Sequence, residues 1–385
     1  MRLRDALSRP GLGAIAEFKR RSPSAGDIRP GARVEDIVPA YGRAGASAVS
    51  VLVDERFAGS VDDLRAARAV TNVPLLAKGF FSTPEHLREV HEAGADAALL
   101  ILRDLDDATA TALMAEAERL GLDVLVEAHD AEELNRATAL GAAVIGINAR
   151  DLSTLDIDRN AQLALVARAP RDRVIVAESA IHSRAQAADA ELAGAAAVLV
   201  GTSLMRAADP AAKLRELISR PLVKVCGLTR QEDVDVAVEA GADLVGFVFA
   251  EGSPRRAPAV LDVPETTLSV SVHVGEAEDA GADLVQLYPE DGGTVRGRDA
   301  VLLRDGEAVA RVLDLPWQGE DPDHWRNAAA TPGRVMLAGG LGPENVRDAI
   351  ETVQPWAVDA ASRLESAPGI KDHAKVRAFV EAARG

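Results

Sequence analysis

The phrase Ala93-Gly94-Ala95-Asp96-Ala97 stands between an amphipathic segment, residues 84–92, and an apolar run, residues 97–102. Near-copies of the phrase, each placed before an apolar run of strand length, recur at residues 44–48, 140–144, 193–196, 240–244 and 280–284. Glycine adopts the left-handed conformation that ends a helix at no steric cost, which explains its fixed place in the phrase. The phrase therefore predicts the junction between helix and strand in a repeated βα unit.

The first 219 residues contain eight apolar runs of strand length, with amphipathic segments between them. The runs lie at residues 14–19, 48–53, 75–80, 97–102, 123–129, 144–149, 173–179 and 197–202. Because these runs are apolar on both faces, they fit parallel strands that helices cover. Eight such units predict a (βα)8 TIM barrel.

From residue 220 the count of apolar runs begins again and reaches eight. These runs lie at residues 223–228, 244–249, 268–274, 284–289, 300–305, 310–315, 335–340 and 357–362. The predicted fold class is therefore α/β, with two tandem (βα)8 TIM barrels as domains 1–219 and 220–385. The second barrel is shortened, because it has only about 20 residues per unit where about 30 are usual. A doubly wound open sheet in each half is the alternative, but no Gly-x-Gly-x-x-Gly follows either first strand.

Composition narrows the class of protein further. Of the 385 residues, 48% are hydrophobic and 27% are charged, which is typical of a globular chain. A formal charge of −17 argues against a nucleic-acid partner, and no apolar run is long enough to predict a membrane span or a secretory signal. The single cysteine, Cys226, excludes an intramolecular disulfide and a zinc site built from cysteines. We expect a soluble cytoplasmic protein with no metal site.

Polar side chains follow the strands of the first barrel, at the end where TIM barrels carry their chemistry. These strand ends hold two lysines and three glutamates: Glu17, Lys19, Lys78, Glu127 and Glu178. Burying so many charges costs free energy unless each is paired or used. Opposed lysines and glutamates shift one another's pKa values, which suits general acid–base chemistry. The alternative interpretation is a rim of solvated charges.

The same strand ends lie in motifs that resemble those of indole-3-glycerol-phosphate synthase. The first motif is Ile15-Ala16-Glu17-Phe18-Lys19-Arg20-Arg21-Ser22-Pro23-Ser24. The others, in chain order, are Leu76-Ala77-Lys78-Gly79-Phe80, Val126-Glu127-Ala128-His129, Gly146-Ile147-Asn148-Ala149-Arg150, Ala177-Glu178-Ser179-Ala180-Ile181 and Val200-Gly201-Thr202-Ser203-Leu204-Met205. The resemblance spans residues 1 to about 219.

This resemblance implies closure of an indole ring from a carboxyphenylamino-deoxyribulose phosphate, with loss of carbon dioxide and water. Lys78 would be the general acid and Glu127 the second acid–base group, while Lys19 and Glu17 would form a pair that orients the substrate. The groups implied for the carboxylate and hydroxyls of the substrate are Asn148, Arg150 and Glu178. The groups implied for its phosphate are Ser22, Ser179, Gly201 and Thr202. Two residues depart from the family pattern: Gly79, where aspartate is usual, and Ala180, where glycine is usual.

In the second barrel Cys226 ends the first strand and Asp314 follows the sixth. A lone cysteine is usually a small core residue. At the mouth of a barrel, however, its thiolate can act as a base, and Asp314 can act as the matching acid.

Motifs around these residues resemble phosphoribosylanthranilate isomerase, which converts an aminoaldose to an aminoketose. They are Lys224-Val225-Cys226-Gly227-Leu228-Thr229, Ser253-Pro254-Arg255, Leu337-Ala338-Gly339-Gly340-Leu341 and Pro343-Glu344-Asn345-Val346. The resemblance implies that Cys226 abstracts the C2 proton, Asp314 is the acid and Arg255 binds the anthranilate carboxylate. The groups implied for phosphate are Gly339, Gly340, Ser362 and Arg363. Arg363 stands where the family usually has glycine.

Together the two resemblances predict a bifunctional enzyme of tryptophan biosynthesis in which the isomerase product is the synthase substrate. No cofactor is expected. The expected partners are small phosphorylated anthranilate sugars, with no nucleic acid or membrane, and the protein is expected to be a monomer. Three alternatives remain: a synthase with a non-catalytic second barrel, a non-enzymatic phosphometabolite-binding protein, and a broader isomerase that also accepts an aminoaldose of the histidine pathway. The cysteine base speaks against the last.

Overall fold

The computed structural model describes residues 2–150, 156–290, 299–315 and 321–385. The chain divides into two compact units. One comprises Met1–His182 and Ala187–Ile218, and the other Ser183–Gln186 and Ser219–Gly385. Each unit contains one closed barrel of eight strands, which confirms the prediction of two barrels. Within the described residues, no helix has the length and apolar character that crossing a membrane requires.

In the first barrel, all eight predicted apolar runs form strands. They are β1 (Gly13–Phe18), β4 (Ala48–Leu52), β5 (Leu75–Lys78), β6 (Ala97–Ile101), β7 (Asp123–Ala128), β8 (Val144–Asn148), β9 (Val174–Glu178) and β10 (Ala197–Val200). Each strand pairs in parallel with its neighbours, and β10 closes the barrel on β1. A short hairpin, β2 (Arg21–Ser22) and β3 (Gly26–Asp27), follows β1.

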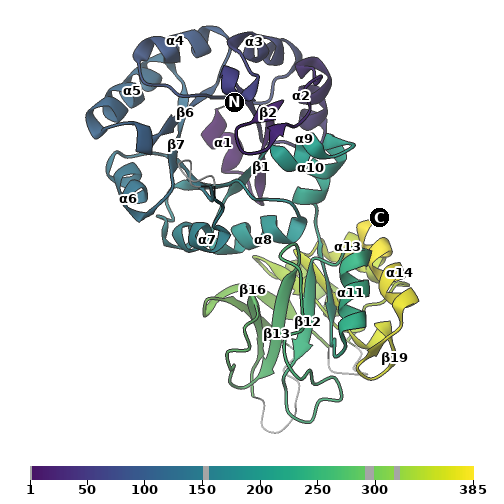
Figure 1. Ribbon diagram of the computed structural model, residues 1–385. Helices are drawn as coiled ribbons and strands as arrows, with labels where there is room; N and C mark the ends of the chain where they lie inside the picture. The colour runs from purple at the N-terminus through teal and green to yellow at the C-terminus, as the bar shows by residue number, and fades with distance from the viewer. Residues whose placement is uncertain (1, 151–155, 291–298, 316–320) are drawn as a thin grey trace. The chain divides into compact units, whose positions relative to one another are not determined.

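A ring of helices surrounds these strands (Figure 1). The helices of the ring are α2 (Val34–Arg43), α3 (Val61–Val70), α4 (Pro84–Glu92), α5 (Asp107–Leu120), α6 (Ala131–Ala139), α7 (Arg159–Arg168), α8 (Arg184–Ala193), α9 (Thr202–Arg206) and α10 (Pro210–Ile218). A further short helix, α1 (Leu3–Leu7), precedes β1 and packs against inward side chains of the barrel. Two 3-10 turns, η1 (Glu55–Phe57) and η2 (Leu102–Asp104), follow β4 and β6. The glycine after α4, Gly94, has φ +96°, as the repeated phrase predicts for a helix end.

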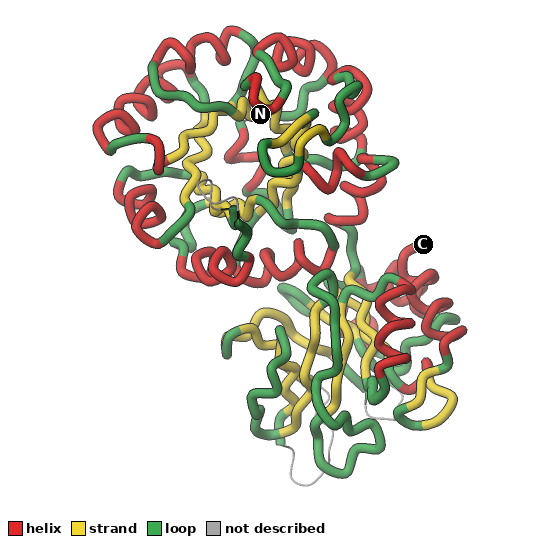
Figure 2. Tube along the Cα trace, in the orientation of Figure 1, coloured by secondary structure: helices red, strands yellow, loops and turns green. Residues whose placement is uncertain are grey.

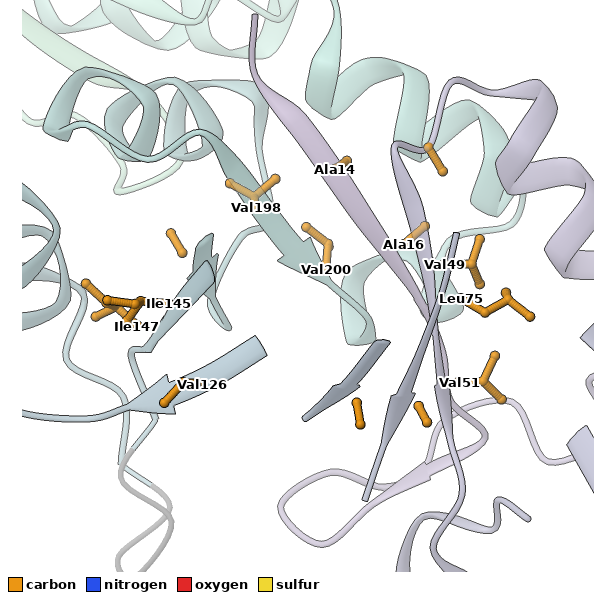
Figure 3. Packing of buried hydrophobic residues seen from close by; sticks show 14 of the residues in the cluster. Ala14, Ala16, Val49, Val51, Leu75, Val126, Ile145, Ile147, Val198 and Val200 are labelled. Carbon is orange, nitrogen blue, oxygen red and sulfur yellow. The ribbon is translucent and has the colours of Figure 1, made fainter. Parts of the chain in front are cut away.

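The core of the first barrel has two layers. Side chains that point outward from the strands, such as Val49, Val198 and Val200, pack against the helices (Figure 3). Inward side chains form a second cluster, to which α1 contributes. Its members include Leu3, Leu7, Ile15, Leu76, Leu125, Val176 and Leu199. The strand ends are thereby held in a fixed ring, because each strand is packed on both faces.

In the second barrel, the eight predicted runs again form strands. They are β11 (Leu222–Cys226), β12 (Leu244–Val248), β13 (Leu268–Val274), β14 (Leu284–Tyr288), β15 (Asp299–Arg304), β16 (Glu307–Leu313), β17 (Val335–Leu337) and β18 (Ala357–Ala360). Their order around the barrel follows the chain, and β18 closes on β11.

The direction of one strand departs from the prediction of eight parallel βα units, because β15 runs antiparallel to both β14 and β16. The two residues that join β15 to β16, Asp305 and Gly306, have φ +50° and +80°. Two consecutive left-handed residues, typically Asp-Gly, make the tight turn of a hairpin, so the chain reverses directly into β16.

Helices cover only part of the second barrel (Figure 2). They are α11 (Gln231–Ala240), α12 (His324–Ala330), α13 (Val346–Val353) and α14 (His373–Arg384). A 3-10 turn, η3 (Ser362–Leu364), and a small hairpin, β19 (Glu365–Ala367) and β20 (Ile370–Lys371), lie before α14. Among the described residues no helix lies between β12 and β16, so the glycine of the phrase before β14, Gly281, ends a loop rather than a helix.

Candidate active sites

The carboxyl ends of the strands in the first barrel surround a cavity of about 420 Å³. It brings together ten of the eleven site residues predicted for this barrel: Glu17, Lys19, Ser22, Lys78, Glu127, Asn148, Arg150, Ser179, Gly201 and Thr202. The eleventh, Glu178, is fully buried beside the cavity. Apolar side chains line another part of the wall: Leu52, Phe57, Phe80, Leu99, Ile101 and Leu199.

Lys78 is the centre of the charged cluster. Its Nζ lies 2.7 Å from Glu178 Oε2, 3.6 Å from Glu17 Oε2 and 3.8 Å from Glu127 Oε2. The second lysine, Lys19, places its Nζ 2.6 Å from Glu17 Oε1. Burial alone would lower the pKa of Lys78, but the three carboxylates outweigh it and raise this pKa well above its usual range. Lys78 is therefore a cation at neutral pH.

The carboxyl groups around Lys78 differ in their pKa values. Burial raises the pKa of Glu178 to about 8, with a further contribution from the charge of Glu127 and against the attraction of Lys78. Burial acts on Glu17 in the same direction, but Lys19 and Lys78 outweigh it and lower the pKa of that group. The local charges thus move the pKa values of these two carboxyl groups in opposite directions.

A histidine that the sequence interpretation did not assign supports Glu127. His129 Nε2 lies 3.3 Å from Glu127 Oε1, and His129 Nδ1 lies 3.0 Å from Glu133 Oε2. Burial opposes a charge on the ring, but the two glutamates raise the pKa of His129 to about 10. Burial would likewise raise the pKa of Glu127, but His129 and Lys78 lower it to about 2. Glu127 is therefore held as a carboxylate.

Two glycines make room for the buried carboxylates. A Cβ on Gly146 would stand 2.0 Å from Glu178 Oε1, and a Cβ on Gly201 would stand 2.2 Å from Glu17 Oε1. Such distances are far below van der Waals contact, so any side chain at these positions displaces a carboxylate. Gly201 was assigned to phosphate from the sequence, whereas the role of Gly146 was missed, since only the packed structure shows what faces it.

The loop after β9 has an unusual backbone. Ser179 and Ala180 have φ +71° and +55°, the left-handed region that favours glycine. This explains why glycine is usual at position 180. The Ser179 hydroxyl donates a 2.8 Å hydrogen bond to Asn148 Oδ1, and Ser22 Oγ lies 2.9 Å from Ser24 Oγ. At the other departure, Gly79, a Cβ would stand 2.9 Å from Val53 Cγ2, so an aspartate there requires Val53 to move.

The mouth of the second barrel contains a buried lysine beside the cysteine. Lys224 and Cys226 stand two residues apart on β11, so both side chains point into the barrel. Lys224 Nζ donates to Asp359 Oδ2 at 2.8 Å and to Gln286 Oε1 at 2.7 Å. Burial raises the pKa of the Cys226 thiol against the attraction of Lys224. A Cβ on Gly246 of β12 would stand 2.6 Å from Cys226 Sγ, so this glycine leaves space for the thiol.

Asp314 directly follows β16 in the same mouth. Its Oδ2 accepts a 2.7 Å hydrogen bond from the Tyr288 hydroxyl, and its Oδ1 accepts one of 2.8 Å from the Leu315 N–H. Burial is the largest effect and raises the pKa of Asp314 to about 6, against the hydrogen bond from Tyr288. This carboxyl group therefore exchanges a proton close to neutral pH.

Arg255 has a partner within the chain. Its Nε lies 2.8 Å from Glu365 Oε1 and its Nη2 lies 2.8 Å from Glu365 Oε2, a bidentate pair. Lys371 Nζ lies 3.1 Å from the same Oε1. Nothing in the sequence indicated this pairing, because Glu365 lies 110 positions away. A substrate carboxylate at Arg255 would share the guanidinium with Glu365.

The residues predicted to bind phosphate in the second barrel lie at two turns. Gly339 and Gly340 follow β17 with φ +84° and +65°, and a Cβ on Gly339 would stand 2.5 Å from Leu315 N. Ser362 begins η3 after β18, and Arg363 forms an ion pair with Glu344. The structure thus places all four at the carboxyl end of the barrel.

Closed barrels with acid–base groups and tight turns at the carboxyl ends of their strands define the class of TIM-barrel proteins. The chain belongs to the indole-3-glycerol phosphate synthase family, which it matches over residues 1–217. Residues 323–382 match the N-(5'phosphoribosyl)anthranilate (PRA) isomerase family.

Relatives match either nearly the whole chain or a little over half of it. The tryptophan biosynthesis protein TrpCF of Yersinia pestis is 35% identical, over 96% of this chain and 84% of that protein. The indole-3-glycerol phosphate synthase of Mycobacterium ulcerans is 41% identical, over 56% of this chain and 79% of that protein. The multifunctional tryptophan biosynthesis protein of Schizosaccharomyces pombe is 33% identical over 98% of this chain. The chain spans 60% of the length of that relative.

Proposed function

We propose that the chain is a bifunctional enzyme of tryptophan biosynthesis. Domain 220–385 would isomerise N-(5-phosphoribosyl)anthranilate to carboxyphenylamino-deoxyribulose phosphate, and domain 1–219 would close that product to indole-3-glycerol phosphate. The observation that supports this most strongly is Lys78, a buried cation whose Nζ lies within 3.8 Å of three carboxyl groups at the cavity. Such an arrangement is costly for stability and is expected where proton transfer is the task.

In the proposed ring closure, Lys78 gives a proton to the ketone oxygen as the ring carbon attacks it. Loss of carbon dioxide and of the new hydroxyl as water completes the indole, with Glu127 as the second acid–base group. Glu127 suits this role because His129 holds it as a carboxylate. Lys19 and Glu17, an ion pair of 2.6 Å, orient the substrate.

The walls of the cavity suit the rest of this substrate. The apolar side chains Leu52, Phe57 and Phe80 offer a surface for an aromatic ring. The groups proposed for its carboxylate and sugar hydroxyls are Asn148, Arg150 and Glu178. The groups proposed for its phosphate are Ser22, Ser179, Gly201 and Thr202.

In the proposed isomerisation, Asp314 protonates the ring oxygen of the aminoaldose as the C1–O bond opens and the nitrogen lone pair forms a C=N bond. Cys226 then acts as the base that removes the C2 proton, and the resulting enolamine becomes the ketose. Arg255 binds the anthranilate carboxylate. The groups proposed for the phosphate are Gly339, Gly340, Ser362 and Arg363. The enzyme would act in the cytoplasm as a monomer, on small phosphorylated substrates, without a cofactor.

Each half of the proposal has its own test. Lys78→Ala is expected to abolish indole formation from the aminoketose phosphate, while the isomerase rate stays unchanged as the internal control. Ring closure that survives Lys78→Ala at the parental rate would refute the mechanism.

For the second barrel, Cys226→Ala and Asp314→Ala are each expected to abolish isomerase turnover and leave ring closure intact. An isomerase rate that neither change lowers, or a parental protein without such a rate, would instead favour a synthase with a non-catalytic second barrel. Reversal of β15 and the pairing of Arg255 with Glu365 are the observations behind that alternative.

A further inference from the structure

A chain of hydrogen bonds crosses the mouth of the second barrel and ends on Asp314. Lys224 Nζ donates to Gln286 Oε1 at 2.7 Å, and Gln286 Nε2 donates to the Tyr288 oxygen at 2.8 Å. The Tyr288 hydroxyl donates in turn to Asp314 Oδ2 at 2.7 Å. Gln286 and Tyr288 stand two residues apart on β14, so both point into the barrel.

The direction of this chain is fixed at one end. An ammonium group has donors only, so the Gln286 oxygen is the atom that faces Lys224 and the Gln286 amide N–H2 group is the one that faces Tyr288. The Tyr288 oxygen then accepts a hydrogen bond, and its own hydrogen is directed at Asp314. A proton on Asp314 Oδ2 would meet this hydrogen, so the acidic proton of Asp314 is displaced from the side that faces Tyr288.

We propose that Tyr288 is a positioning residue of the isomerase, which aims the proton of Asp314 at the substrate and is itself oriented by Lys224 through Gln286. The proposal rests on the isomerase activity proposed above. It adds that one cation, Lys224, both lies beside the Cys226 base and orients the acid Asp314 through Gln286 and Tyr288.

The other groups near Asp314 limit how its titration is interpreted. Among the described residues, the titratable groups that act on Asp314 or Tyr288 are Lys224 and Cys226 of β11 and Asp359 of β18. Asp359 is the ion-pair partner of Lys224. These groups remain in place when the Tyr288 hydroxyl alone is removed. The hydrogen bond from that hydroxyl favours the charged form of Asp314, so its loss raises the pKa of Asp314.

The test is Tyr288→Phe in the full chain, followed by isomerase kinetics between pH 5 and 9. We expect kcat to fall about tenfold, KM to change less than about twofold, and the limb of the profile that reports the ionisation of Asp314 to move up by roughly one pH unit. The chain has two tyrosines, so Tyr41→Phe in the first barrel is the matched control and should leave the isomerase profile unchanged.

Gln286→Glu provides a second, nearly isosteric test. The carboxylate of the new glutamate accepts from both Lys224 and the Tyr288 hydroxyl, which turns that hydroxyl away from Asp314 and moves the limb that reports Asp314 in the same direction. Unchanged profiles in both variants would overturn the role of Tyr288, provided that Cys226→Ala still abolishes turnover. If Cys226→Ala leaves turnover intact, it is the proposed isomerase function that fails.

Discussion

The two barrels place a buried lysine at the same kind of position but balance its charge differently. Around Lys78, three glutamates and a second lysine form an ion cluster inside a complete ring of helices. Lys224 instead has one carboxylate partner and a chain of hydrogen bonds between neutral side chains, in a barrel that helices cover only in part. The comparison teaches that a buried lysine at a barrel mouth can be stabilised either by several carboxylates or by one carboxylate and neutral hydrogen-bond partners.

The largest effect on stability is expected from removing Lys224, with the removal of Lys78 as its counterpart in the first barrel. Lys224→Met leaves Asp359 buried and, among the described residues, without another cation partner, so it should cost about 3–5 kcal/mol in the free energy of unfolding. Lys78→Met should cost only about 1–2 kcal/mol, because Glu17 keeps Lys19, Glu127 keeps His129 and burial favours the neutral form of Glu178. Urea unfolding at pH 7 measures both. Equal costs would break the comparison.

The next largest effect is expected from adding one methyl group at the mouth of each barrel. Gly201→Ala drives a Cβ into the carboxylate of Glu17, and Gly246→Ala drives one into the Cys226 thiol. We expect each change to lower only the activity of its own barrel, by about 100-fold, since a displacement of about 1 Å costs that much. Kinetics of both reactions on both variants give a two-by-two comparison, in which cross-effects would contradict the independence of the two mouths.

The pH dependence of stability should separate the ion cluster from the hydrogen-bond chain. The pKa of His129 is raised from 6.5 to about 10 in the folded protein, so its contribution is full below pH 6.5 and is lost as pH rises through 10. His129→Gln should therefore cost about 2–4 kcal/mol at pH 6 and nearly nothing above pH 10. Chemical denaturation across this range measures the difference. If His129→Gln lowers the free energy of unfolding by the same amount at all pH values, the imidazole of His129 acts by packing alone.

The smallest effect is expected at the strained turn after β9. Ala180 has φ +55°, so Ala180→Gly should stabilise the protein by about 1 kcal/mol. It should also ease the approach of phosphate to this loop and lower KM for ring closure. Thermal unfolding and synthase kinetics test both expectations, and Ala58→Gly, at φ +53° directly after η1, serves as the matched control for strain away from the phosphate turn.

Much of this architecture follows from the sequence, because strand positions depend on local apolar runs and catalytic groups on strand ends. All sixteen runs form strands. The sequence prediction did not include the antiparallel direction of β15, although Asp305-Gly306 is a strong hairpin signal. The apolar run at residues 300–305 has the length and spacing of the other strands of the repeat. Residues that act by leaving room, such as Gly146, or by pairing over a long distance, such as Glu365, depend on packing that no local pattern contains.

The hairpin at Asp305-Gly306 has a consequence for how the second barrel assembles. Parallel neighbours need a crossover of a dozen or more residues before they can pair, whereas a two-residue turn lets β15 and β16 pair within microseconds. This part of the barrel has low contact order and can form as an early nucleus. The reversed strand would thus give the shorter barrel a starting point for folding that the all-parallel pairing of the first barrel does not offer.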